Sequence, residues 1–291
     1  MKKLFTILLV SLLMGLPLKA QWTQILTGQS SLIDAVCVVN DSVIWIKDQM
    51  GDKFSITKDR GKTGATKNFP VGITSNRMCG SLSAVSDKVA YVIVSQSSAT
   101  DKQGIYKTVD GGDTWTRQAT AFNSASSFPD MVYFWNENEG VVIGDGISNA
   151  NGILEIYTTT NGGAQWNAVP AANMPTATSP DWGTNTNSFF RVRGNTISVI
   201  AGSGWIYKST NRGLNWTGVS TPVINNNSNA KFDFKDDNNG LLSNYNATKK
   251  LYYLYSTANG GANWAKIDST SMISEIKYVP SLNTYFSTGT T

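Results

Sequence analysis

The stretch Lys107-Thr108-Val109-Asp110-Gly111-Gly112-Asp113-Thr114-Trp115 decides the fold, because variants of it recur along the chain. The copies share the pattern Ser/Thr-x-Asp/Asn-x-Gly-x-x-Trp, and only the first, which has Gly64 at the last position, lacks the tryptophan. The Asp or Asn stands at positions 59, 110, 161, 211 and 259, at intervals of 51, 51, 50 and 48 residues. A fixed period of this length predicts an array of similar structural units.

Each copy has the chemistry of a tight turn followed by a strand. Asp or Asn can accept hydrogen bonds from backbone N–H groups a few residues on, and glycine supplies a left-handed residue. The tryptophan opens the next strand and is expected to pack under the turn, so that Gly64 predicts a looser first turn. The residues with this structural role are Asp59, Asp110, Trp115, Asn161, Trp166, Asn211, Trp216, Asn259 and Trp264.

These repeats resemble the Asp-box, or BNR repeat, of the sialidase-like β-propellers, a superfamily that includes sialidases, sortilin-type receptors and photosystem II assembly factors. The resemblance covers nearly all of the chain after its first twenty residues. It implies the fold rather than an activity, because in that superfamily the box is structural and lies away from the ligand site.

Short β-branched and aromatic runs between the turns predict four-stranded antiparallel blades. The sequence thus predicts an all-β propeller with five recognisable blades and a partial sixth formed by 272–279 and 284–287, either a truncated ring or a six-bladed one. In the first blade, three strands are expected, at 32–39, 43–47 and 54–57. Trp22–Leu26 is expected to be a strand that helps to close the ring.

Residues 1–20 have a basic start, an apolar run from Leu4 to Leu16 and a small residue at the end, which is typical of a secretory signal peptide. A membrane anchor is the alternative, but the run is shorter than the ~20 residues that span a bilayer. We expect residues 21–291 to form the propeller domain, secreted or at the cell surface. Without its first twenty residues the chain has 21 basic and 20 acidic residues, and no basic cluster suggests nucleic-acid binding.

The chain contains no histidine, which excludes histidine-based triads, a histidine general base and histidine metal sites. No metal-ligand spacing or phosphate-binding loop is present, so neither a metal nor a cofactor is expected. Cys37 and Cys79 lie in neighbouring blades, and a disulfide and two buried thiols remain equal alternatives.

Ligands of a propeller with this strand order are expected on the face that carries the loops between blades, opposite the repeat turns. The longest such connection, 170–187, contains Asp181-Trp182-Gly183. An exposed Trp182 beside Asp181 would suit stacking on a sugar ring or a protein hot spot. The alternative is that Trp182 pins the long loop onto the body.

Arg191 and Arg193 lie on one face of an expected innermost strand, because strand side chains alternate. Two arginines near a channel could bind a carboxylate, and the alternative is an ion pair between blades. For catalysis, only Glu275 with Tyr278 has a position on an inner strand, and their odd spacing puts them on opposite faces.

The resemblance to sialidases implies arginines, an Asp acid and a Tyr–Glu pair that this chain does not match well, so whether it is an enzyme stays open. We expect a non-catalytic module that binds a protein or a carbohydrate through its loop face. The alternatives are a sialidase-like glycoside hydrolase and an assembly factor for a membrane complex.

Overall fold

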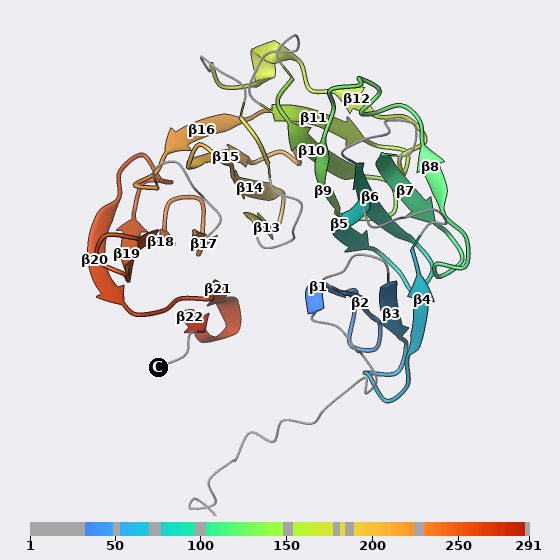
Figure 1. Ribbon diagram of the computed structural model, residues 1–291, viewed down its shortest axis with the longest axis horizontal. Coiled ribbons are helices and arrows are strands. Elements are labelled where there is room, and N and C mark those ends of the chain that lie inside the picture. Colours follow the sequence, from blue (N-terminus) through green and yellow to red (C-terminus); the bar gives the residue numbers. More distant parts are fainter. Residues whose placement is uncertain are drawn as a thin grey trace, which may run out of the picture.

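The computed structural model describes residues 33–48, 53–69, 77–96, 103–147, 154–176, 181–183, 189–223 and 230–288. Strands dominate these ranges, and helical structure is limited to short 3-10 segments such as η1 (Ala171–Asn173) and η4 (Pro280–Leu282). The sheets are arranged around a common centre like the blades of a wheel (Figure 1). The predicted segment Trp22–Leu26 lies outside the described residues.

The first three blades follow one another in chain order, each with its strands hydrogen-bonded in sequence order. Blade 1 contains β1 (Ile33–Val38), β2 (Ile44–Asp48), β3 (Lys53–Thr57) and β4 (Ala65–Asn68). Blade 2 contains β5 (Arg77–Ala84), β6 (Ala90–Gln96), β7 (Gly104–Thr108) and β8 (Thr116–Gln118). Blade 3 contains β9 (Pro129–Phe134), β10 (Gly140–Asp145), β11 (Leu154–Thr159) and β12 (Asn167–Ala168).

The remaining blades keep this topology until the last one, which has two strands within the described ranges. Blade 4 contains β13 (Phe190–Arg193), β14 (Thr196–Ile200), β15 (Trp205–Ser209) and β16 (Thr217–Ser220). Blade 5 contains β17 (Lys231–Phe234), β18 (Gly240–Asn246), β19 (Leu251–Thr257) and β20 (Ala265–Thr270). Blade 6 contains β21 (Glu275–Val279) and β22 (Thr284–Thr288).

Every strand pair is antiparallel, and the first strand of each blade lies nearest the centre (Figure 1). Four hydrophobic clusters fill the seams between consecutive blades from blade 1 to blade 5. In the first seam, for example, Trp45 and Phe54 of blade 1 pack against Val92 of blade 2. The molecule is therefore an all-β propeller, and the fold prediction is confirmed.

The five repeat turns, between the third and fourth strands of blades 1–5, share one hydrogen-bond pattern. In blade 2, the Thr108 hydroxyl accepts the Gly112 N–H at 2.8 Å and donates to Asp110 at 2.7 Å. Asp110 in turn accepts the Thr114 N–H at 3.0 Å. The same set of bonds holds the turns that begin at Thr57, Thr159, Ser209 and Thr257. Gly64 does not remove these bonds from the first turn.

Each repeat turn needs two consecutive residues with positive φ, where the sequence predicted one glycine. In blade 2 these are Gly111 (φ 77°) and Gly112 (φ 84°), whereas blade 4 places Arg212 (φ 59°) before its glycine and blade 1 places Arg60 (φ 65°) there. A Cβ on Gly112 would lie 2.2 Å from the Phe54 ring of the preceding blade. The second residue is thus glycine for two reasons, its left-handed backbone and its contact with the neighbouring blade.

The repeat turns and the first hairpin turns lie on the same face of the wheel, as expected. In each of blades 1–5, the residue after the Asp or Asn donates its backbone N–H to a carbonyl in the turn between the first two strands, for example Gly111 to Lys88 O at 2.9 Å. The loops between blades and the turns between second and third strands therefore occupy the opposite face, here called the loop face.

Blade 1 has the fourth strand expected of each blade, β4, which the sequence analysis did not locate because Gly64 replaces the tryptophan. Phe69, 4% exposed, follows β4 and packs its ring 4.8 Å from that of Phe54. The two cysteines remain thiols, and Cys37 donates to Leu82 O at 3.0 Å. Burial raises the pKa of the Cys37 thiol to about 11.

Candidate functional site

The segment Asp181–Gly183 is anchored on the loop face by a buried carboxylate. Asp181 is 4% exposed and accepts hydrogen bonds from the Ser203 N–H at 3.0 Å, from the Ser203 hydroxyl and from the Tyr207 hydroxyl at 2.8 Å. Ser203 lies in the turn between β14 and β15, and Tyr207 lies on β15. Burial, followed by the charge of Asp181, raises the pKa of Tyr207, so this hydroxyl stays a donor at neutral pH.

The other side of the segment is attached to blade 3. The Gly146 N–H donates to Asp181 O at 2.7 Å, and the Gly183 N–H donates to Asp145 Oδ1 at 2.8 Å. The segment therefore joins blades 3 and 4 at the loop face, through backbone as well as side-chain bonds. Bonds to both blades therefore hold the segment in place.

The anchored segment holds Trp182 on the surface. Its side chain is 51% exposed, although the Trp182 carbonyl accepts the Gly202 N–H at 2.8 Å. The indole lies directly over Gly202, where a Cβ would come within 1.8 Å of the ring. Trp205, 37% exposed, begins β15 at the end of the same turn. The β14–β15 turn therefore carries a large, fixed aromatic surface.

A buried carboxyl pair lies beneath this segment. Asp130, on β9, is 2% exposed and lies against Asp145 and Gly183, where a Cβ would come within 2.4 Å of Asp130 Oδ2. Burial, and then the charge of Asp145, raises the pKa of Asp130 to about 9. The pair consequently shares a proton at neutral pH, which makes it a structural contact rather than an acid–base pair open to substrate.

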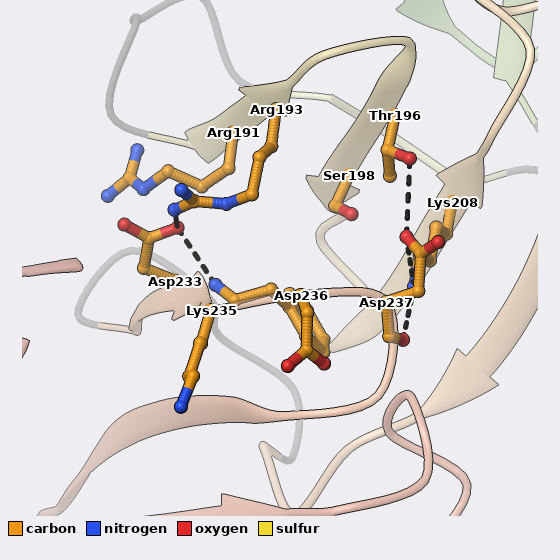
Figure 2. Close-up of a pocket in the computed structure, with 10 residues that line it drawn as sticks. Arg191, Arg193, Thr196, Ser198, Lys208, Asp233, Lys235, Asp236 and Asp237 are labelled. Atoms are coloured by element: carbon orange, nitrogen blue, oxygen red, sulfur yellow. Dashed lines mark hydrogen bonds and ion pairs between the residues drawn. The ribbon is translucent and has the colours of Figure 1, made fainter. Parts of the chain in front are cut away.

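Arg191 projects from the inner strand β13 and is 8% exposed (Figure 2). Its Nε donates to Phe232 O at 2.9 Å, its Nη1 to Phe190 O at 2.8 Å and its Nη2 to Glu275 Oε1 at 2.5 Å. Arg191 thus links the first strands of blades 4, 5 and 6 by an ion pair, which is the alternative that the sequence left open.

Arg193 points to the same side of β13 but is held more loosely (Figure 2). Its Nη2 lies 3.6 Å from Asp233 Oδ1, and its guanidinium lies over the Tyr278 ring at 5.0 Å. The neighbouring groove between blades 4 and 5, of about 230 Å³, is lined by Arg193, Lys208 and Asp237 among others. The two arginines predicted together therefore differ in environment.

Glu275 and Tyr278 contact different groups. Glu275 forms the ion pair with Arg191, whereas the Tyr278 hydroxyl donates to Asn283 at 2.8 Å and its ring faces Arg193. No cluster of three or more His, Cys, Asp or Glu side chains able to hold a metal is found within the described ranges. In the same ranges, the structure contains no helix with the length and apolar character to cross a bilayer.

Comparisons with known proteins agree with the fold. No protein-family model and no curated protein matches the chain. Among solved structures, YCF48 from Cyanidioschyzon merolae is 16% identical with 90% of this chain and 94% of that one covered (TM-score 0.48). A structure of YCF48 bound to D1 peptide is also 16% identical, with 84% and 82% covered (TM-score 0.39). The GH74 xyloglucanase of Xanthomonas campestris is 15% identical, covering 81% of this chain but 38% of the enzyme (TM-score 0.52). The chain is thus similar to propellers, and at these identities the likeness shows the fold alone.

The sequence analysis missed several residues of this region. Ser203 and Tyr207 hold Asp181, and Asp130 and Asp145 support Gly183, yet none of the four belongs to a motif.

Proposed function

We propose that this protein is a non-catalytic binding module of the Asp-box type, which binds a protein or a glycan through its loop face. The observation that carries the proposal is Trp182, whose indole is half exposed although the Asp181–Gly183 segment that holds it is bonded to blades 3 and 4. An aromatic side chain fixed in this way loses little entropy when a ligand covers it, and such residues dominate binding interfaces.

The burial of Asp181 favours a binding role for Trp182 over the alternative that Trp182 only attaches the long loop to the body. If Trp182 only attached the loop to the body, its indole would be buried, but here Asp181 is the buried group and about half of the indole stays exposed above Gly202. Placing a carboxylate at 4% exposure has a desolvation cost, which the hydroxyl and backbone donors of Ser203 and Tyr207 offset. We infer that this arrangement fixes the direction of the ring.

Neither acidic site favours hydrolysis. Glu275 is engaged by Arg191, and the Asp130–Asp145 pair is enclosed beneath the segment. The proposal includes export, with residues 1–20 as a signal peptide and the propeller outside the cytoplasm.

The test is a glycan array and an array of extracellular proteins probed with purified wild-type protein and with Trp182→Ala. We expect saturable binding on one array and a loss of about 2 kcal/mol or more on truncation of the indole. Leu214→Ala is the matched control, because Leu214 is 52% exposed but belongs to a repeat turn on the other face.

Binding that survives Trp182→Ala, or that falls equally in Leu214→Ala, would contradict the proposal. Turnover of a fluorogenic sialoside that is lost on Glu275→Gln would instead identify a hydrolase. Recovery with a membrane protein complex, independent of Trp182, would favour the assembly-factor alternative.

A further inference from the structure

A second cavity lies in the central channel, at the end opposite Trp182. Its volume is about 480 Å³, and residues from the first strands of all six blades line it, including Val38, Ala84, Phe134 and Arg193. These four are the last residues of their strands, which lead into the first hairpin turns. The cavity therefore belongs to the face of the repeat turns, where the sequence predicted no ligand.

Arg193 lines this cavity, and the N–H groups of its guanidinium have no hydrogen-bond acceptor among the described residues. Whereas Arg191 donates to two carbonyls and a carboxylate, the side chain of Arg193 makes no hydrogen bond to any residue in the described ranges. Its Nε is buried and has no partner among those residues. A guanidinium presents its donors in a planar fork that matches a carboxylate, so an arginine held with its donors open suits an anion.

The only acid in contact with Arg193 within the described ranges is already occupied. Asp233 accepts the Phe234 N–H at 2.8 Å through Oδ1 and the Tyr278 N–H at 2.8 Å through Oδ2. Its 3.6 Å separation from Arg193 is an ion pair without a hydrogen bond. Asp233 can thus neutralise part of the charge of Arg193, but it does not satisfy the guanidinium.

Lys277, on β21, adds a second positive charge to the lining. Lys277 is an exposed residue, and within the described part of the chain its side chain forms no ion pair or hydrogen bond. The surrounding protein, and then Arg191, lowers the pKa of Lys277, because the charged ammonium lacks full solvation and has a like charge nearby. An anion in the cavity would relieve both effects.

The opposite wall of the cavity is apolar. Val36 and Val38 of β1 line it and are 53% and 69% exposed, and Tyr133 of β9 lies beside them. Exposed valines on an inner strand are unusual, because apolar side chains gain free energy when they are covered. A ligand that touched both walls would need a charged end and an apolar body.

We propose that this cavity binds a carboxylate attached to an apolar body, with the carboxylate on Arg193 and Lys277 and the body against Val36 and Val38. The site is separate from the loop-face surface around Trp182, so it stands or falls independently of the proposed function. The volume of about 480 Å³ is within the range of small-molecule sites.

The experiment titrates the purified protein with hexanoate, hexanamide and inorganic phosphate, and follows the heat of binding and the Nε–H resonances of arginine. Hexanoate and hexanamide share the apolar body and differ in charge. We expect hexanoate to bind saturably and to shift the Arg193 resonance, with affinity about tenfold or more above that of hexanamide and phosphate.

Arg193→Gln and Lys277→Gln should each weaken hexanoate binding by about tenfold or more. Lys53→Gln is the control, since it removes one positive charge from the exposed start of β3 and should leave binding unchanged. If Arg193→Gln does not fold, Lys277→Gln and the resonance shift carry the test. Equal binding of hexanoate and hexanamide, equal binding of phosphate, an equal loss in Lys53→Gln or no saturation would each overturn the proposal.

Discussion

The two faces of the wheel are built in different ways. On the face of the repeat turns, five turns use the same hydrogen bonds, in which a glycine N–H donates to a Ser or Thr hydroxyl and that hydroxyl donates to Asp or Asn. On the loop face, the Asp181–Gly183 segment uses bonds that occur once, such as those from Ser203 and Tyr207 to Asp181. The difference indicates that repeated residues maintain architecture, whereas residues that occur once are the candidates for function.

Arg191 and Arg193 repeat this contrast at the scale of one strand. They are two residues apart on β13, but Arg191 is bound to blades 5 and 6 and Arg193 keeps its donors open. Alternation along a strand could place both side chains on one face, but it could not separate a structural arginine from one able to bind a ligand.

The largest expected effect is on the repeat-turn side. Trp216 is 4% exposed and donates to Gly213 O at 2.8 Å under its own turn. Trp216→Ala should lower the free energy of unfolding by about 3–5 kcal/mol, because it opens a cavity in the seam between blades 3 and 4. Chemical denaturation measures this. Trp205→Ala, at a position 37% exposed, should cost less than half as much, and equal losses would contradict the comparison.

The next effect concerns the loop face. Burial is the main cause that raises the pKa of Asp130 to about 9. The protonated carboxyl therefore contributes its full share to the free energy of unfolding below its ordinary pKa, and this contribution is lost as pH rises through 9. Asp130→Asn should remove this loss and stabilise the protein by about 1–3 kcal/mol at pH 8. Melting temperatures from pH 5 to 9 should fall for wild type and stay flat for the variant. Asp41→Asn, at an exposed position, should behave like wild type.

A smaller, opposite pH effect is expected in two of the repeat turns. Hydrogen bonds from Thr63 lower the pKa of Asp59 to about 2, and those from Thr114 lower the pKa of Asp110. Their stabilisation is present above the ordinary pKa and is lost as pH falls through the lowered one. Amide exchange in these turns should therefore speed up in acid relative to the turn of Asn161, which carries no charge to lose. Equal acid sensitivity in all turns would show that the carboxylates do not hold them.

The smallest effect tests the left-handed position. Arg60 has a φ of 65° and an exposed side chain. Arg60→Gly should stabilise by about 0.5 kcal/mol, because relief of left-handed strain slightly exceeds the entropy cost of glycine. Arg212→Gly should bring no gain, since Arg212 pairs with Glu139 and lies over Trp135. Denaturant midpoints distinguish the two variants. A higher midpoint for Arg212→Gly would mean that the contacts of Arg212 with Glu139 and Trp135 do not stabilise the protein.

Much of the architecture could be predicted from the sequence because local chemistry repeats. Asp110 and its equivalents predict the positions of the repeat turns, and the period of about fifty residues between them predicts the succession of blades. Two features were hidden: Arg60 and Arg212 occupy a left-handed position that glycine usually marks, and Gly64 obscured strand β4.

The candidate sites were less predictable because they depend on contacts between distant residues. The buried Asp181 carboxylate is held by hydrogen bonds from Ser203 and Tyr207. Arg191 pairs with Glu275, which lies 84 positions away in the sequence. No spacing in the sequence marks such pairs, since they form only when the register and the order of the blades are known. Trp182 could be selected as an aromatic beside a carboxylate, but the burial of that carboxylate could not.

The most direct test of the contrast between the two faces measures unfolding and ligand binding side by side for Trp182→Ala and Trp216→Ala. The account predicts that Trp182→Ala unfolds like wild type and loses its array ligand, whereas Trp216→Ala is strongly destabilised yet binds that ligand at temperatures where it remains folded. A Trp182→Ala protein that loses stability and keeps its ligand would contradict the account.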